Sequence, residues 1–111
     1  MKSHKVLSSH ILGALDRIEQ YTNGMSKQQF LDNFLVQDAV ITNIAVIAEA
    51  SKKIPSDIKD AFPQVPWRKI MAMRNKVIHE YFGIDLEVLW NVVEVDIIEL
   101  KIQVAKIREL E

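Results

Sequence analysis

The chain has 111 residues, and its 14 lysines and arginines against 15 aspartates and glutamates give a net charge of −1. The length favours one domain over residues 1–111. The nearly neutral charge argues against a protein that coats nucleic acid by charge alone. The absence of cysteine excludes a disulfide framework and a thiolate zinc site. The N-terminus lacks the apolar run of a signal peptide and no segment approaches the ~20 residues of a membrane span, so we expect a cytoplasmic protein without a membrane partner.

Apolar residues at helical spacing, without strand-like alternation, predict an all-α chain. The first predicted helix covers residues 3–21 and stops at Asn23-Gly24. Ser26 and Gln29 form a capping box for a second helix, from about residue 27 to residue 52. Its predicted inward face consists of Phe30, Phe34, Ile41, Ile44, Ala45 and Ala48.

A connector follows, broken by the prolines Pro55, Pro63 and Pro66. Ser56 is predicted to cap a short helix within it that ends at Phe62. The next helix begins at Trp67, directly after a proline, and ends before Gly83, where a left-handed cap is usual.

Asp85 is predicted to cap the last helix, which carries two apolar stripes. The first is heptad-like and consists of Leu86, Trp90, Val93, Ile97, Leu100, Val104 and Ile107. The second consists of Val88, Val92, Val95, Ile98 and Ile102. Two apolar faces are more than a small bundle covers, so we interpret the second stripe as a dimer interface, with a broad intramolecular core as the alternative. The predicted fold is a homodimeric antiparallel up-down bundle of four long helices plus a short extra helix.

Arg74 interrupts the apolar stripe of the helix that starts at Trp67. A guanidinium there needs a carboxylate partner or an anion-binding cleft, because a buried unpaired charge is costly. Asp38 and Glu49 lie on or beside the inward face of the second helix, and either could be the partner. The surrounding residues 51–79 carry seven basic side chains against two acidic ones, which suits a polyanion as well as an ordinary solvated surface.

His79 is the only histidine outside the first helix. Asn75 precedes it by four residues, so its amide could hydrogen-bond one imidazole nitrogen and leave the other for proton transfer. Arg74 lies five residues before His79, which separates them by roughly 140° around an ideal helix. Together with Tyr81 they provide an anion holder, a titratable base and a phenol.

Cleavage of RNA through its 2′-hydroxyl needs a base, an acid and positive charge at the phosphorus. An imidazole can be either acid or base, and an arginine can hold a phosphate bidentately. One chain offers one such histidine, whereas a symmetric dimer would supply two. No cluster of acidic or histidine ligands calls for a metal or another cofactor, so a metal-free mechanism is favoured. By spacing alone, His79 could equally be a cation at a helix end and Tyr81 a packed rim residue.

The run from Arg74 to Tyr81, RNKVIHEY, resembles the signature of HEPN domains, in which an arginine and a polar residue precede a histidine. Four residues between arginine and histidine, and a tyrosine two after the histidine, are similar to HepT-like toxins. Other positions resemble that family as well, namely Ile47-Ala48-Glu49-Ala50, Trp67, Ile70, Phe82, Asp85 and Trp90.

The resemblance implies a dimeric, all-helical toxin of a type VII (HepT/MntA-like) toxin–antitoxin pair, acting as a metal-independent endoribonuclease. Arg74 and His79 would be catalytic and Asn75 supporting. An MntA-like nucleotidyltransferase antitoxin would inactivate the toxin by transferring AMP from ATP onto Tyr81. Two alternatives stay open: a non-catalytic helical subunit that positions substrate for a nucleotidyltransferase, and a plain helical dimerisation module.

Overall fold

The computed structural model describes residues 3–79 and 83–110, except for the side chains of Val77 and Ile78. Every regular element in this part of the chain is a helix, which confirms the all-α prediction. The elements in chain order are α1 (His4–Thr22), α2 (Lys27–Leu31), α3 (Phe34–Lys52), α4 (Ser56–Ala61), α5 (Trp67–His79), α6 (Leu86–Asn91), the π-helical segment η2 (Val92–Asp96) and α7 (Ile97–Arg108).

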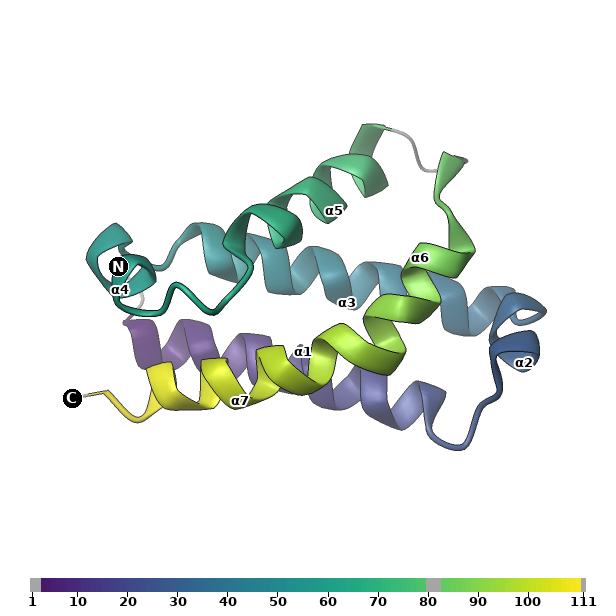
Figure 1. Cartoon of the computed structure of the whole chain (residues 1–111), viewed down its shortest axis with the longest axis horizontal. Helices are drawn as coiled ribbons and strands as arrows, with labels where there is room; N and C mark the ends of the chain where they lie inside the picture. Colours follow the sequence, from purple (N-terminus) through teal and green to yellow (C-terminus); the bar gives the residue numbers. More distant parts are fainter. Residues whose placement is uncertain (1–2, 80–82, 111) are drawn as a thin grey trace.

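The four long elements run alternately up and down (Figure 1). Helices α1 and α3 pack along each other, α7 packs on α1, and α5 packs on α3. Their facing sides form one apolar core, and its most deeply buried large side chains include Leu7, Ile11, Leu15, Ile18, Phe30, Val40, Val104 and Ile107. Helix α5 thus packs chiefly on α3.

The second predicted helix is two helices, because the chain turns at Asp32 and Asn33. The Asn33 side chain accepts a hydrogen bond from the Val36 amide at 3.0 Å and so caps α3. The buried Gln37 amide donates to the carbonyls of Phe30 and Leu31 at 2.9 and 3.0 Å, which replaces bonds that a continuous helix would make.

This turn changes which residues of α3 face inward. Ile41, Ile44 and Ala48 are buried as predicted and Ala45 is half-buried, but Phe34 is 76% exposed. The prediction for Phe34 was wrong because it assumed one helical phase from residue 27 onward, whereas α3 starts anew at Phe34.

Two helix starts can be compared with their predicted caps. Asp85 caps α6 as predicted, accepting from the Glu87 amide at 2.9 Å. Ser56 does not cap α4, because Pro55 occupies the N-cap position, and no side chain of the described residues makes a capping bond there. Ser56 is instead the first residue of that helix.

The last helix is continuous but contains the π-helical segment, which the sequence did not predict. The first stripe is inward as predicted: Leu86 and Trp90 are partly buried, and Val93, Ile97, Leu100, Val104 and Ile107 are buried. In the second stripe Val92 is buried, whereas the other four are 50–59% exposed: Val88, Val95, Ile98 and Ile102. A broad intramolecular core therefore does not account for these four side chains.

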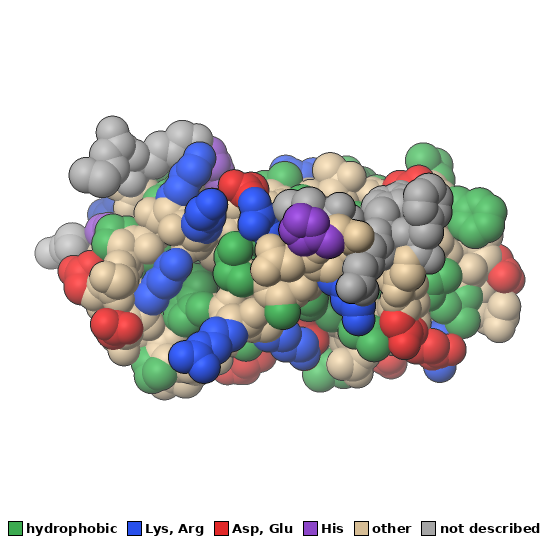
Figure 2. All heavy atoms as spheres, turned by 90° about the horizontal axis from the view of Figure 1, so that it is seen from above, with side chains coloured by type: hydrophobic (Ala, Val, Ile, Leu, Met, Phe, Trp, Pro, Cys, Tyr) green, Lys and Arg blue, Asp and Glu red, His purple; other side chains and the backbone are tan. Residues whose placement is uncertain are grey.

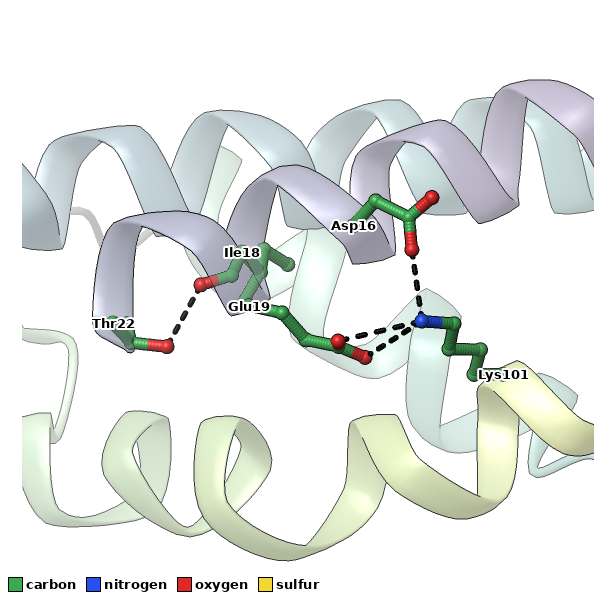
Figure 3. Close-up of polar contacts among 5 residues, drawn as sticks. All are labelled: Asp16, Ile18, Glu19, Thr22 and Lys101. Carbon is green, nitrogen blue, oxygen red and sulfur yellow. Dashed lines mark hydrogen bonds and ion pairs between the residues drawn. The ribbon is translucent and has the colours of Figure 1, made fainter. Parts of the chain in front are cut away.

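Lys101 ties α7 to α1 through two carboxylates, Asp16 at 2.9 Å and Glu19 at 3.2 Å (Figure 3). The hydrogen bond to Asp16, and then the one to Glu19, raise the pKa of Lys101 above its ordinary value. In the same view the Thr22 hydroxyl donates to the Ile18 carbonyl at 2.7 Å in the last turn of α1. These contacts fix the register between the first and last helices.

By length and composition α3 could cross a membrane, with a mean hydropathy of 1.4, which the sequence analysis did not anticipate. Half of its apolar window is buried within the bundle. Since α1 and α5 both pack on it, the apolar character of α3 is that of a core helix in a globular protein.

Candidate functional site

Helix α5 carries the predicted site, and its first turns are anchored firmly. The Pro66 carbonyl accepts the first helical bond, from the Ile70 amide at 3.0 Å, and the Trp67 indole donates to the Phe62 carbonyl at 3.2 Å. Ile70 is buried against α3. The start of α5 thus fixes the rotation of the helix, and with it the direction of each later side chain.

Arg74 points toward α3, where its Nη2 forms an ion pair with Glu49 Oε1 at 2.9 Å. The predicted carboxylate partner is therefore confirmed, and Glu49 provides it. The Arg74 side chain is 24% exposed, and its buried Nε has no hydrogen-bond partner in the part of the chain that the structure describes. A phosphate could reach only the terminal nitrogens, Nη1 and Nη2, which are also the atoms suited to a bidentate contact.

Asp38, the other candidate partner, lies eleven residues before Glu49 on α3 and is exposed. The ion pair of Arg74 joins it to Glu49 and not to Asp38. The distinction depends on how α3 and α5 are aligned along each other, which apolar periodicity does not specify.

Asn75 and His79 are both exposed on α5. Asn75 Oδ1 accepts a hydrogen bond from Arg74 Nη1 at 3.3 Å. No hydrogen bond joins Asn75 to His79 in the described residues, so the suggested fixing of the imidazole by this amide is not found. In this structure Asn75 supports Arg74 instead.

His79 is the last residue of α5 and lies on its outward side. Arg74 faces the bundle, in keeping with the roughly 140° that five residues subtend on a helix. Within one chain the structure thus places the two residues on one helix end without bringing them onto one face. Tyr81, the predicted modification site, lies outside the described residues.

Other charged side chains lie on and around α5. Lys69 forms an ion pair with Asp96 of η2 at 2.6 Å, a link between α5 and the last helix that the sequence did not reveal. Lysine and arginine side chains gather over the face that α5 presents (Figure 2). Among the described residues, no group of three His, Cys, Asp or Glu side chains could hold a metal ion.

Comparison with known proteins identifies the family. The family profile described as "HepT-like: Ribonuclease HepT-like" matches residues 11–107. A protein of Thermococcus cleftensis named "Probable ribonuclease HepT" is 43% identical over 108 residues, which cover 97% of this chain and 98% of that protein. A protein of Caldanaerobacter subterraneus subsp. tengcongensis, named as an RNase, is 32% identical over 111 residues, all of this chain and 99% of the relative.

A longer relative from Methanocaldococcus jannaschii is 38% identical over 108 residues, which cover 97% of this chain but 49% of that protein. Its name joins a gamma-glutamylcyclotransferase to an RNase. No solved structure shows a significant match. The profile match and the relatives that align end to end show that the chain belongs to the HepT-like ribonuclease family.

Proposed function

We propose that this protein is a metal-independent endoribonuclease that cleaves RNA through the 2′-hydroxyl, with Arg74 and His79 as its catalytic residues. The observation that carries the proposal is the end of α5, where a part-buried arginine oriented by Glu49 is followed five residues later by an exposed histidine. Membership of a ribonuclease family supports the same chemistry.

In the proposed reaction, a base removes the proton of the 2′-hydroxyl, and its oxygen attacks the adjacent phosphorus. The bond from phosphorus to the 5′-oxygen breaks, and an acid returns a proton to that oxygen, leaving a 2′,3′-cyclic phosphate and a 5′-hydroxyl. His79 can fill either role because imidazole gains and loses a proton near neutral pH. The terminal nitrogens of Arg74 would stabilise the charge on the phosphorane oxygens, with Asn75 supporting the guanidinium.

Two proton-transfer groups require a second histidine, which we propose comes from a second copy of the chain. The exposed side chains of the second stripe would form the dimer interface: Val88, Val95, Ile98 and Ile102. Four half-exposed branched side chains on one helix are a surface that self-association would cover.

We further propose that the protein is the toxin of a type VII toxin–antitoxin pair, silenced by an MntA-like nucleotidyltransferase. That antitoxin would transfer AMP from ATP onto the phenol oxygen of Tyr81, with release of pyrophosphate. Tyr81 follows His79 by two residues, so a nucleotide attached there would cover the imidazole and place a phosphate near Arg74.

Cleavage of RNA in the presence of EDTA tests the catalytic assignment. We expect His79→Ala and Arg74→Ala each to lower the rate at least ~100-fold, the low end of what acid–base catalysis contributes, and to abolish growth toxicity. Lys106→Ala on α7 removes a charge from an exposed position and serves as the control. Full cleavage by both variants, with helical content retained by circular dichroism, would reject the assignment.

Protein that binds ATP but never cleaves RNA would instead identify a non-catalytic partner of a nucleotidyltransferase.

Modification is tested separately by mass spectrometry after incubation with the nucleotidyltransferase and ATP. We expect Tyr81→Phe to stay unmodified, whereas Tyr21→Phe, which alters an exposed tyrosine on α1, should still gain AMP. AMP on the Tyr81→Phe variant would refute this site.

A further inference from the structure

The outward side of α5 carries a line of exposed residues that the proposed chemistry does not use in full. Arg68, Ala72, Asn75 and His79 are spaced by four, three and four residues and are all exposed, so they follow one another along one face of the helix. We name them the α5 stripe. It runs from the proposed catalytic end of α5 back to its first turn.

Some basic residues of the bundle are held by carboxylates, and others, among them Lys5 and Lys106, have no ion pair within the described residues. Lys27, Lys69 and Lys101 each form an ion pair with a carboxylate. In contrast, Arg68 and Lys76 have no carboxylate partner among the described residues. Both are exposed, so their charge is available to an anion from outside.

The basic surface continues past Arg68 at the same end of the bundle. The end of α3 lies at the end where α5 begins (Figure 1), and there Lys52 and Lys53 are exposed and likewise without an ion pair among the described residues. Figure 2 shows blue side chains spread over this part of the α5 face, with few red ones between them. The face therefore attracts a polyanion along its length and not at one point.

We infer that single-stranded RNA lies along the α5 stripe, with the cleaved phosphate at Arg74 and His79 and a flanking phosphate on Arg68. This rests on the proposed function and adds the path of the substrate and a residue that holds a flanking phosphate. His79 and Arg68 are eleven residues apart, roughly 16 Å along the axis at 1.5 Å per residue. With ~3.4 Å per nucleotide in a stacked strand, and more when extended, that span takes at most about five nucleotides.

The side chains of the α5 stripe favour a single RNA strand that is bound through its phosphates. Arg68 on the stripe and Lys76 beside it offer separate single charges on one side of α5, which suit one phosphate backbone, whereas a duplex presents two. No aromatic side chain belongs to the stripe, and the nearby Trp67 is half-buried beneath the Lys59 ammonium, 5.7 Å from its ring. Binding along the stripe should therefore depend on salt and on RNA length, with little base preference.

Fluorescence anisotropy with a labelled 12-nucleotide, fully 2′-O-methylated RNA measures binding without cleavage. We expect Arg68→Ala to weaken binding roughly tenfold, as for one lost charge-assisted contact. It should also reduce the slope of log Kd against log salt concentration by about 0.7, the value for one phosphate of a single strand. Arg68→Lys should retain most of the affinity and the slope.

Lys106→Ala is the matched control, because it removes the same charge from an exposed position on α7, which packs on α1 and not on α5's outward face. The gain in affinity from a 4-nucleotide to a 12-nucleotide RNA should shrink in Arg68→Ala. Equal affinities of Arg68→Ala and Lys106→Ala would overturn the inference, as would duplex RNA that binds as tightly as the single strand. If RNA cleavage by the wild type persists in that case, only the path fails and the nuclease proposal stands.

Discussion

Arg74 is the residue whose surroundings say most about the site. Its side chain is three-quarters buried, its Nη2 lies 2.9 Å from Glu49 Oε1, and its Nε has no hydrogen-bond partner among the described residues. An ion pair in such a position should be worth more than a fully exposed one, but Glu49 is half-exposed, so solvent screens the pair. We therefore expect the coupling energy between the two side chains to be about 1 kcal/mol.

A double-mutant cycle with Glu49→Gln and Arg74→Met, followed by urea unfolding, measures this coupling. Both replacements keep the approximate size of the side chain, so packing changes little. The same cycle in 1 M salt should give a smaller value, because ions screen partly exposed charges. A coupling of zero at low salt would mean that Glu49 does not hold Arg74 in solution.

The sequence predicted that Arg74 needs a carboxylate partner, but not which carboxylate provides it. An arginine on an apolar stripe requires a carboxylate, and both Asp38 and Glu49 were candidates. The suggested bond from Asn75 to His79 is not found among the described residues, where the Asn75 oxygen accepts from the guanidinium of Arg74. Helical spacing predicts which side chains are neighbours, but not which of several neighbouring donors will hydrogen-bond to a given acceptor.

Gln37 decides the most unexpected element boundary, the corner between α2 and α3. Gln37 is 5% exposed, and its side-chain amide donates to the carbonyls of Phe30 and Leu31. Gln37→Met keeps the volume but removes the donor to both carbonyls. The Phe30 carbonyl still accepts from the Asn33 amide at 3.2 Å, whereas the Leu31 carbonyl loses its side-chain donor, and a buried unsatisfied group costs ~1–3 kcal/mol. We expect a loss of about 2 kcal/mol in the free energy of unfolding, seen as a fall in Tm of roughly 10 °C.

Gln28→Met is the control for this effect. Gln28 lies on α2 and bonds Asp32 at the surface, where substitutions usually change stability by less than ~0.5 kcal/mol. If the two glutamine variants unfold at the same temperature, the corner does not depend on Gln37.

The turn between α2 and α3 was not predicted from the sequence, for a physical reason. Apolar residues continue at helical spacing through Asp32 and Asn33, so periodicity alone predicts one long helix. The deciding features are an asparagine cap and one buried amide, and the burial of that amide follows only from the packed bundle. The π-helical segment of the last helix is similar, because no local residue pattern announces it.

Lys101 connects α7 to α1, and its charge makes that connection sensitive to alkaline pH. Its pKa is raised by Asp16 and Glu19. A lysine with a raised folded-state pKa contributes stability that is present below its unfolded pKa, about 10.4, and is lost as the pH rises through the folded value. Lys101→Met should therefore be less stable than wild type at pH 8, with the difference shrinking above pH ~10.4 in urea titrations. A difference that stays constant to pH 11.5 would contradict this role.

For the whole molecule, the sequence predicted the fold class and the inward stripe of the last helix correctly. It also predicted two apolar stripes there, and the structure buries one and exposes most of the other. A second copy of the chain on that exposed stripe would decide how the site is completed. The geometry of the site makes the question important, since α5 places Arg74 and His79 on different faces of one helix and leaves each chain with a single histidine at the site.

Ile98→Glu tests whether that stripe joins two copies of the chain. Ile98 is 59% exposed near the middle of the stripe, so a carboxylate there is well solvated in a monomer but would be buried in a symmetric interface. We expect sedimentation velocity to give twice the 12.8 kDa chain mass for wild type and the single-chain mass for Ile98→Glu. RNA cleavage should fall together with the dimer.

Leu35→Glu provides the matched control, because Leu35 is 79% exposed on α3 and lies outside the stripe. It should remain a dimer and keep its activity. A dimer that survives Ile98→Glu but dissociates with Leu35→Glu would move the interface to the start of α3. A wild-type protein that sediments as one chain while cleaving RNA would show that a single imidazole suffices, and the proposed pairing of two sites would have to be abandoned.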